Sequence, residues 1–219
     1  MPHSARQQYE ENSPNRHSWR PRRDAGLPGM TITLRFAAAG LTAGLLILGA
    51  GSAQAAPAAA PSEATWIADV TTVTSQATTY LQQRLSSPGR NAIVLDIDNT
   101  SLESYYHPVW TTPAVPPVLT LAKLAKADGA AVFFVTDRTE LIRSLTQDNL
   151  SGVGFPVDGL SMRPLFNFDP AQVNKTKARA AIEAQGYTIV ANIGNNTTDL
   201  DGGHAERTFK LPDYDGALS

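Results

Sequence analysis

The chain has 219 residues, with 18 Lys and Arg against 20 Asp and Glu, and it contains no cysteine. A formal net charge of −2 does not suggest a nucleic-acid-binding protein, because such proteins usually carry a basic surface. The lack of cysteine excludes disulfides and thiolate chemistry.

The first residues do not read as part of a folded domain. Residues 1–29 are polar, rich in Arg and Pro, and without a periodic apolar pattern, so we interpret them as a disordered or non-native extension. Met30 is then the expected start of translation. The adjacent Arg22 and Arg23 raise the alternative of a twin-arginine signal, but they lie far from the apolar run that follows.

A secretory signal peptide is predicted over residues 30–55. Arg35 supplies a positive charge, residues 36–50 form the uncharged run "FAAAGLTAGLLILGA", and "AQA" at residues 53–55 offers a cleavage site after Ala55. The apolar run is shorter than the roughly 20 residues of a membrane-spanning helix. We therefore expect a secreted protein without a membrane partner after cleavage.

Cleavage there leaves a mature chain of 164 residues, the size of one domain. The leader holds six Arg and three acidic residues, which leaves 12 basic against 17 acidic residues and a formal charge of −5. Residues 56–64 read as an Ala- and Pro-rich linker, and residues 65–219 as the folded domain.

The domain opens with a predicted helix that ends at Pro88 and Gly89. Apolar residues recur along it at spacings of three and four: Trp66, Val70, Val73, Ala77, Leu81 and Leu85. Strands and helices then alternate. The predicted strands cover residues 92–97, 130–135, 157–163 and 187–193. The predicted helices cover residues 117–127, 139–150 and the segment from Asp169-Pro170 to Gly186.

Most of these strands are continuous apolar runs, which indicates burial on both faces, as in a parallel sheet covered by helices. The fold class is therefore a three-layer α/β domain. About 37 residues separate Asp98 from Thr136, and the interval from Asp137 to Lys175 is similarly short, so neither holds a large cap domain.

Polar side chains follow three of these strands. Asp96 and Asp98 end the first strand, Thr136 and Asp137 follow the second, and residues 195–199 follow the last. In such a sheet, ligands bind outside the carboxyl ends of the strands. These side chains are therefore the candidate site.

The two carboxylates that end the first strand should face the same side, because they lie two residues apart in an extended segment. Carboxylates that close repel each other unless a metal ion, a shared proton or a lysine stands beside them. Lys175, in the first turns of the last predicted helix, is the natural lysine. The alternative is a solvated helix lysine like Lys177.

Four short motifs in this order resemble the haloacid dehalogenase-like hydrolases: "DIDNT", "FFVTDR", "NKTKAR" and "GNNTTDL". Within that superfamily the chain looks like the secreted acid phosphatase branch that includes plant vegetative storage proteins. The features that carry this closer resemblance are "SYYHP", "LSMRP" and "FKLPDYDG". The resemblance covers roughly Trp66 to Gly216 and implies a Rossmann-like parallel sheet without a large cap.

The resemblance implies roles for four residues. Asp96 would be the nucleophile that forms an aspartyl-phosphate, and Asp98 the acid that protonates the leaving alcohol and then the base that activates water. Thr136 would bind a phosphoryl oxygen, and Lys175 would steady the nucleophile and the transferring charge. An alternative role for Thr136 is to cap the helix that follows it.

The resemblance also implies Mg²⁺, held by the side chain of Asp96, the backbone carbonyl of Asp98 and the fourth motif. In that motif the chain has Asn195 where the family usually has Asp, and it retains Asp199. An amide oxygen ligates Mg²⁺ without adding charge, so we expect weaker metal binding unless Asp199 compensates directly or through water.

The expected substrate is an exposed phosphomonoester, because an uncapped site is open. Asn99, Asp137, Tyr106 and His107 are further candidates for substrate contacts, and packing explains Tyr106 and His107 equally well. The oligomeric state stays open. Two other functions are a non-catalytic binding or storage protein, suggested by the altered fourth motif, and a signalling receiver domain, which the signal peptide and the Asp-x-Asp spacing disfavour.

Overall fold

The computed structural model describes residues 59–109 and 111–219. The predictions for residues 1–29 and for the signal peptide over residues 30–55 lie outside the described residues. Among the described residues, no helix is long and apolar enough to cross a membrane.

Helix α1, Glu63–Arg84, begins where the Ser62 hydroxyl accepts a hydrogen bond from the main-chain N–H of Thr65 at 3.2 Å. A serine at this position satisfies one of the N–H groups that a helix start leaves without a partner. The buried side chains of α1 recur at spacings of three and four: Trp66, Val70, Thr74, Ala77 and Leu81. This face packs on the sheet and on α2.

All five strands of the sheet are parallel, in the order β3-β2-β1-β4-β5. Their bounds are Asn91–Leu95 for β1, Ala131–Thr139 for β2, Gly159–Arg163 for β3, Thr188–Gly194 for β4 and Thr208–Lys210 for β5. Leu95 at the end of β1 pairs with Phe134 of β2 and Ile193 of β4. The register therefore brings the polar residues after these strands to one edge of the sheet.

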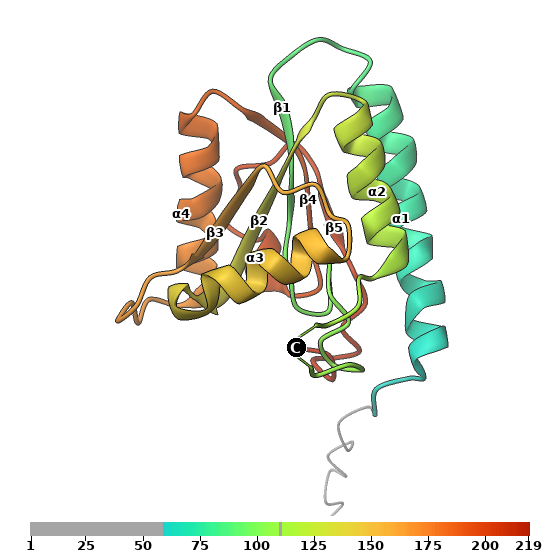
Figure 1. The fold of residues 1–219 in the computed structure, drawn as a ribbon. Helices are drawn as coiled ribbons and strands as arrows, with labels where there is room; N and C mark the ends of the chain where they lie inside the picture. Colours follow the sequence, from blue (N-terminus) through green and yellow to red (C-terminus); the bar gives the residue numbers. More distant parts are fainter. Residues whose placement is uncertain (1–58, 110) are drawn as a thin grey trace, which may run out of the picture. The chain divides into compact units, whose positions relative to one another are not determined.

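Helices cover both faces of the sheet, which confirms the three-layer α/β prediction (Figure 1). The bounds of the remaining helices are Pro116–Ala127 for α2, Arg143–Gly152 for α3, Ala171–Ala184 for α4 and Thr197–Leu200 for α5. Helices α1 and α2 pack on the larger core. Helix α4 covers the opposite face, where Ile182 joins a cluster with Ala92, Val94, Phe133 and Ile189.

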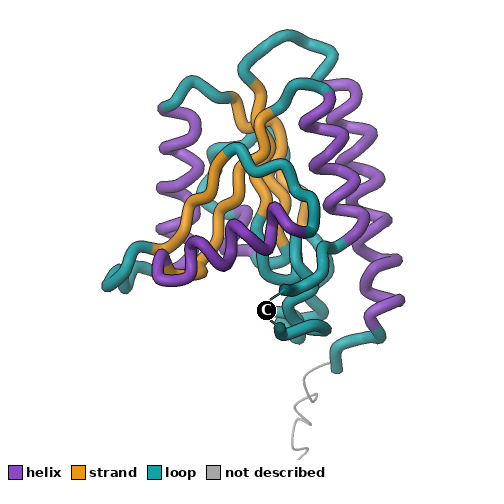
Figure 2. Tube along the Cα trace, viewed as in Figure 1, coloured by secondary structure: helices purple, strands orange, loops and turns teal. Residues whose placement is uncertain are grey.

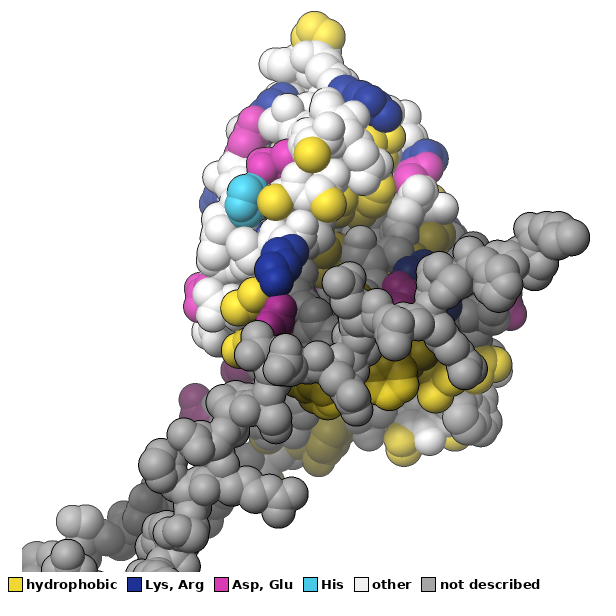
Figure 3. All heavy atoms as spheres, turned by 90° about the vertical axis from the view of Figure 1, so that its left-hand side faces the viewer, with side chains coloured by type: hydrophobic (Ala, Val, Ile, Leu, Met, Phe, Trp, Pro, Cys, Tyr) yellow, Lys and Arg dark blue, Asp and Glu magenta, His cyan; other side chains and the backbone are white. Residues whose placement is uncertain are grey.

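Loops gather at the carboxyl ends of the strands, and the C-terminus lies among them (Figure 2). Between β1 and β2 the described residues form α2 and loops, and between β2 and α4 they form one short 3₁₀ turn, α3 and β3. No large cap domain is present in this part of the chain. Basic and acidic side chains are interspersed on the described part of the face shown in Figure 3, so they form no continuous basic surface there.

Several local features differ from the sequence prediction; β1, for example, ends at Leu95 rather than at residue 97. Strand β2 continues to Thr139, where the prediction started a helix, because Thr139 pairs with Arg163 of β3 after a register shift. A 3₁₀ turn over Glu140–Ile142 then precedes α3. The short elements α5 and β5 were not predicted at all.

Candidate active site

A hollow of about 470 Å³ opens at the carboxyl edge of the sheet. Most of the predicted site residues line it: Asp96, Asp98, Asn99, Thr136, Asp137, Lys175 and Asn195. The ends of β1, β2 and β4 and the first turns of α4 supply these residues. Residues far apart in the sequence therefore share one small volume, as expected for an α/β sheet.

Lys175 joins two carboxylates at the base of this hollow. Its Nζ donates to Oδ1 of Asp96 at 2.7 Å and to Oδ1 of Asp199 at 2.5 Å. All three side chains are less than a tenth exposed. A buried charge is tolerated when it is paired, so this trio holds the ammonium at a fixed place beside Asp96.

The surroundings shift the pKa values of this trio. Burial raises the pKa of Asp96 to about 7, against the opposing effect of the Lys175 charge. Burial alone would lower the pKa of Lys175, but the charges of Asp96 and Asp199 raise it well above its usual value. Lys175 therefore stays a cation beside Asp96.

Asp98 is held by Arg138, which the sequence analysis did not single out. The Arg138 guanidinium donates from Nε to Oδ2 of Asp98 at 2.9 Å and from Nη2 to Oδ1 at 2.6 Å, and the Ser104 hydroxyl donates to Oδ1 at 2.6 Å. Burial would raise the pKa of Asp98, but these bonds lower it. Arg138 stands in the "FFVTDR" motif, so that motif was the signal that could have identified it.

Both ends of the Asn195 side-chain amide have a partner inside the protein. Its Oδ1 accepts from the Thr100 hydroxyl at 3.1 Å, and its Nδ2 donates to the carbonyl of Leu218 at 2.8 Å. Asn99 donates to the same carbonyl at 2.8 Å. An aspartate at position 195 has no N–H for the Leu218 carbonyl, so the amide is one of two side chains that tie the C-terminal segment to the edge of the hollow.

Gly194 explains how β4 brings Asp199 so close to the site. A Cβ atom at Gly194 would collide with the side chain of Asp199. Asp199 also accepts from the main-chain N–H of Asn196 through Oδ2, at 2.8 Å, as part of a capping box at the start of α5. Both of its carboxylate oxygens thus have protein partners, and Asp199 is not among the residues that line the hollow.

Tyr106 and His107 do not line the hollow. The Tyr106 ring packs against Trp66 with ring centroids 5.2 Å apart, and its hydroxyl donates to the carbonyl of Pro61 at 2.8 Å. His107 faces Glu63 and Glu103. These two residues hold the loop after β1 against the start of α1.

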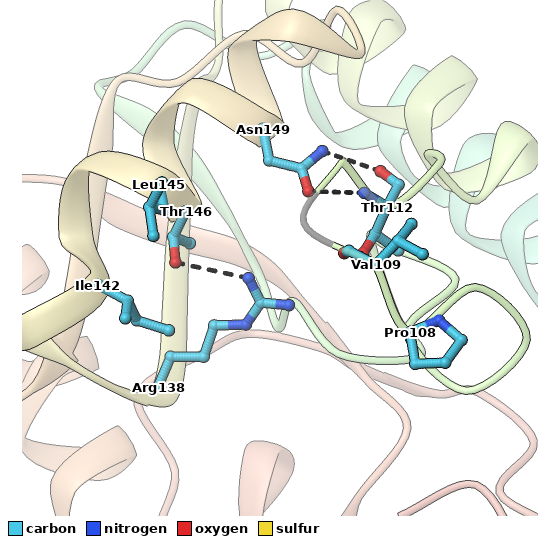
Figure 4. Close-up of a pocket in the computed structure, with 8 residues that line it drawn as sticks. All are labelled: Pro108, Val109, Thr112, Arg138, Ile142, Leu145, Thr146 and Asn149. Carbon is cyan, nitrogen blue, oxygen red and sulfur yellow. Dashed lines mark hydrogen bonds between the residues drawn. The ribbon is translucent and has the colours of Figure 1, made fainter.

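A second pocket of about 620 Å³ adjoins the hollow through Arg138 (Figure 4). Its apolar walls come from Val109, Ile142 and Leu145, with Pro108 at one side. The Arg138 guanidinium reaches toward the Thr146 hydroxyl, at 3.4 Å. One arginine therefore borders both a polar hollow and an apolar pocket.

Comparison with known families identifies this arrangement. The family model described as HAD superfamily, subfamily IIIB (acid phosphatase) matches residues 52–217. The chain belongs to this family. The match confirms the resemblance to the haloacid dehalogenase-like acid phosphatases.

Similar plant proteins support the same branch of the HAD superfamily. Vegetative storage protein 2 of Arabidopsis thaliana is 30% identical over 144 residues, covering 56% of this chain and 54% of the relative. The stem 28 kDa glycoprotein of Glycine max is 31% identical and covers 66% of each chain. Acid phosphatase 1 of Solanum lycopersicum is 31% identical, over 58% of this chain and 59% of the relative. The chain thus spans between about half and two thirds of the length of these curated relatives.

A solved structure has the same fold. The class C acid phosphatase from Bacillus anthracis aligns with a TM-score of 0.58 and 19% identity, over 71% of this chain and 83% of that one. At this level of identity the likeness concerns the fold alone.

HAD-superfamily proteins generally use a divalent metal, and the donors at the hollow fit a hard cation. Lys175 bonds only Oδ1 of Asp96, so within the described part of the chain the other carboxylate oxygen has no hydrogen-bond donor. The Asn195 amide oxygen accepts one hydrogen bond and has a second lone pair. Together with the Asp98 carbonyl these are oxygen donors, although the set includes a single carboxylate.

Proposed function

We propose that the protein is a secreted, Mg²⁺-dependent acid phosphatase that hydrolyses phosphomonoesters through an aspartyl-phosphate on Asp96. The observation that carries this proposal is the placement of Lys175 Nζ 2.7 Å from Asp96, at the base of an open hollow that Thr136 also lines. A carboxylate nucleophile beside a fixed cation suits attack on a phosphoryl group.

In the first half of the reaction, a carboxylate oxygen of Asp96 attacks phosphorus and the bond from phosphorus to the ester oxygen breaks. The leaving alcohol takes a proton from Asp98. In the second half, Asp98 removes a proton from water, and the resulting hydroxide displaces Asp96 from phosphorus. Lys175 and the Thr136 hydroxyl bind oxygens of the phosphoryl group, where negative charge grows in both steps.

Asp98 can donate a proton only after its contact with Arg138 loosens, because the guanidinium favours the ionised carboxylate. A phosphate group is a competing partner for a guanidinium, which binds it with two parallel hydrogen bonds. Substrate that draws Arg138 away from Asp98 would let the pKa of Asp98 rise. Arg138 thus links substrate binding to the protonation of Asp98.

Mg²⁺ would be held by the Asp96 carboxylate, the Asp98 carbonyl and the Asn195 amide oxygen, and it would neutralise charge on the phosphoryl group. Asp199 would support this set through Lys175 rather than as a direct ligand, because Asp199 does not line the hollow. Since Asn195 adds no charge, we expect a modest affinity for the cation.

The substrate class follows from the pocket beside Arg138. Val109 lines one side of this pocket, and Ile142 and Leu145 line the other (Figure 4). A phosphomonoester with an apolar organic group, such as an aryl phosphate, would place phosphate in the hollow and the organic group in this pocket. The open mouth and the absence of a large cap in the described part of the chain suit such exposed substrates.

Replacement of Asp96 by Asn tests the proposal. Hydrolysis of a chromogenic aryl phosphate should fall by at least about 10³-fold, because an amide cannot take up the phosphoryl group. Asp128→Asn, at the exposed end of α2, is the matched control and should turn over like the parent. Unchanged turnover of Asp96→Asn, with its fold verified by circular dichroism, would refute the mechanism.

A non-catalytic binding or storage protein is the second candidate. The Asn195 amide, at the position where the family usually has a charged ligand, is bound to the carbonyl of Leu218. Two of the similar plant proteins are named vegetative storage proteins. This candidate predicts no Mg²⁺-stimulated turnover on any phosphomonoester, whereas the phosphatase predicts turnover that EDTA removes.

Secretion rests on the predicted signal peptide over residues 30–55. The test is the N-terminal sequence of protein recovered from the culture medium, which should begin at Ala56. Protein that stays with the cells and retains its leader would contradict it.

A further inference from the structure

Three side chains come together where the loop after β1 reaches the start of α1. The proposed reaction uses none of them. Glu63 is the first residue of α1, and Glu103 and His107 lie four positions apart in the loop. Nε2 of His107 is 3.2 Å from an oxygen of Glu63 and 3.4 Å from an oxygen of Glu103. One ligating atom from each residue lies within 4.8 Å of the other two. We call this group the Glu-Glu-His cluster.

Glu103 is the buried member of the cluster, with 5% of its surface exposed. The loop is fixed around it, because its main-chain N–H donates to Pro113 at 3.0 Å and its carbonyl accepts from His107 at 2.8 Å. Within residues 59–109 and 111–219, no hydrogen-bond donor outside the cluster reaches its carboxylate. A buried carboxylate that faces a second one needs a proton or a cation.

We propose that the Glu-Glu-His cluster binds a divalent transition-metal ion, with Zn²⁺ as the best match. Zn²⁺ accepts imidazole nitrogen and carboxylate oxygen at about 2.0–2.2 Å. Ligand atoms around a tetrahedral ion with bonds of that length lie about 3.3 Å apart. The separations of 3.2 and 3.4 Å from His107 Nε2 to the two carboxylates lie on either side of that spacing.

This cluster and the hollow at the strand ends differ in the atoms that they offer to a metal ion. The hollow offers oxygen donors, which suit Mg²⁺, whereas the imidazole of His107 favours a transition metal. The side chains of Glu63 and His107 are about two-fifths exposed, at 43% and 41%, so an ion can enter from solvent and water can complete its coordination.

The place of the cluster gives the ion a structural role. His107 is followed directly by Pro108 and Val109, which form a wall of the apolar pocket beside Arg138 (Figure 4). An ion bound to both Glu63 and His107 would fix this wall against the start of α1. Metal binding at the cluster would thus help to hold the shape of this pocket, which the loop borders on one side.

Calorimetric titration of the full chain with Zn²⁺ tests the proposal. The experiment uses the Asp96→Asn variant, freed of metal with EDTA, so that the hollow lacks its carboxylate ligand. We expect one Zn²⁺ per chain and, after His107→Gln or Glu103→Gln, an affinity lower by at least about 100-fold. His204→Gln is the matched control, because His204 contacts a single carboxylate, that of Glu183, and should leave the affinity unchanged.

Two results would overturn the proposal. One is the absence of Zn²⁺ binding in the Asp96→Asn protein, which would make the cluster an ordinary contact between a protonated histidine and two carboxylates. The other is binding that His107→Gln does not weaken. If Glu103→Gln does not fold, Glu63→Gln at the more exposed position serves in its place. Because the parent of these variants already lacks Asp96, the outcome is independent of the phosphatase mechanism.

Discussion

Arg138 binds both carboxylate oxygens of Asp98, with N···O distances of 2.9 and 2.6 Å. Arginine and carboxylate form such paired bonds with well-defined geometry. The pair joins the loop after β1 to the end of β2, and it favours the ionised form of the residue that the proposed mechanism uses as both acid and base.

Replacement of Arg138 by Gln should lower the free energy of unfolding at pH 7 by about 1 kcal/mol, a small value because the Asp98 side chain is 44% exposed and water screens the pair. Since folding lowers the pKa of Asp98, this contribution is present above about pH 4 and is lost as the pH falls through the lower folded pKa. Urea unfolding at pH 7 and at pH 3 checks this. If the free energies of unfolding of the parent and of Arg138→Gln differ as much at pH 3 as at pH 7, the prediction is wrong.

Replacement of Lys175 by Met should lower the free energy of unfolding by roughly 3–5 kcal/mol, because it leaves two buried carboxylates, Asp96 and Asp199, without their shared cation. Turnover should be lost with it. Lys177→Met is the matched control: Lys177 pairs with Asp169 on the exposed side of α4, so its loss should leave stability and turnover unchanged. Similar urea midpoints for the two variants would show that Lys175 does not hold the site together.

Replacement of Asn195 by Asp removes the hydrogen bond to the Leu218 carbonyl and should cost about 1–2 kcal/mol of stability in EDTA. The new carboxylate adds charge to the proposed Mg²⁺ ligands, so added Mg²⁺ should restore the melting temperature. Asn99→Asp loses a hydrogen bond to the same carbonyl and serves for comparison. The measurement is the melting temperature of both variants with and without Mg²⁺. If Mg²⁺ raises the melting temperature of both variants equally, residue 195 is not a ligand position.

Replacement of Gly194 by Ala should destabilise the protein by roughly 1–3 kcal/mol, because the added methyl group meets the Asp199 side chain and displaces it from Lys175. Gly152→Ala, in the last turn of α3, meets nothing within 4 Å and should be neutral or slightly stabilising. Thermal unfolding of both variants is the measurement. The account of Gly194 fails if the two substitutions have equal effects.

Much of the fold could be predicted because its signals are local. Continuous apolar runs indicated β1, β2 and β4. The helix-start signal at Asp169-Pro170 and the glycine at 186 indicated the two ends of α4. Strand β5 was missed because three residues are too few for a pattern, and it forms only by pairing with β4. The start of α3 was misplaced because the pairing of Thr139 with Arg163 extends β2, and that pairing depends on tertiary structure.

The candidate site was likewise predicted only in part. Asp96, Asp98 and Thr136 were predicted correctly as residues that line the hollow, because each follows a predicted strand and the carboxyl ends of parallel strands lie at one edge of the sheet. The hydrogen bonds that Asn195 makes to Thr100 and Leu218 could not be foreseen, because they depend on where the C-terminal segment folds back.

The Arg138 pairing was missed for a related reason, since nothing in the spacing of 40 residues indicates a contact with Asp98. Tyr106 and His107 follow a motif in the sequence, yet their side chains face α1 rather than the hollow.

The central claim is that Asp96 carries the phosphoryl group during turnover. The most direct test is to quench the protein in acid during hydrolysis of an aryl phosphate and to map its peptides by mass spectrometry. The account predicts one phosphoryl group, labile to hydroxylamine, on the peptide that contains Asp96, and none on that peptide from Asp96→Asn. Rapid turnover with no phosphorylated peptide, or with the phosphoryl group on another residue, would contradict it.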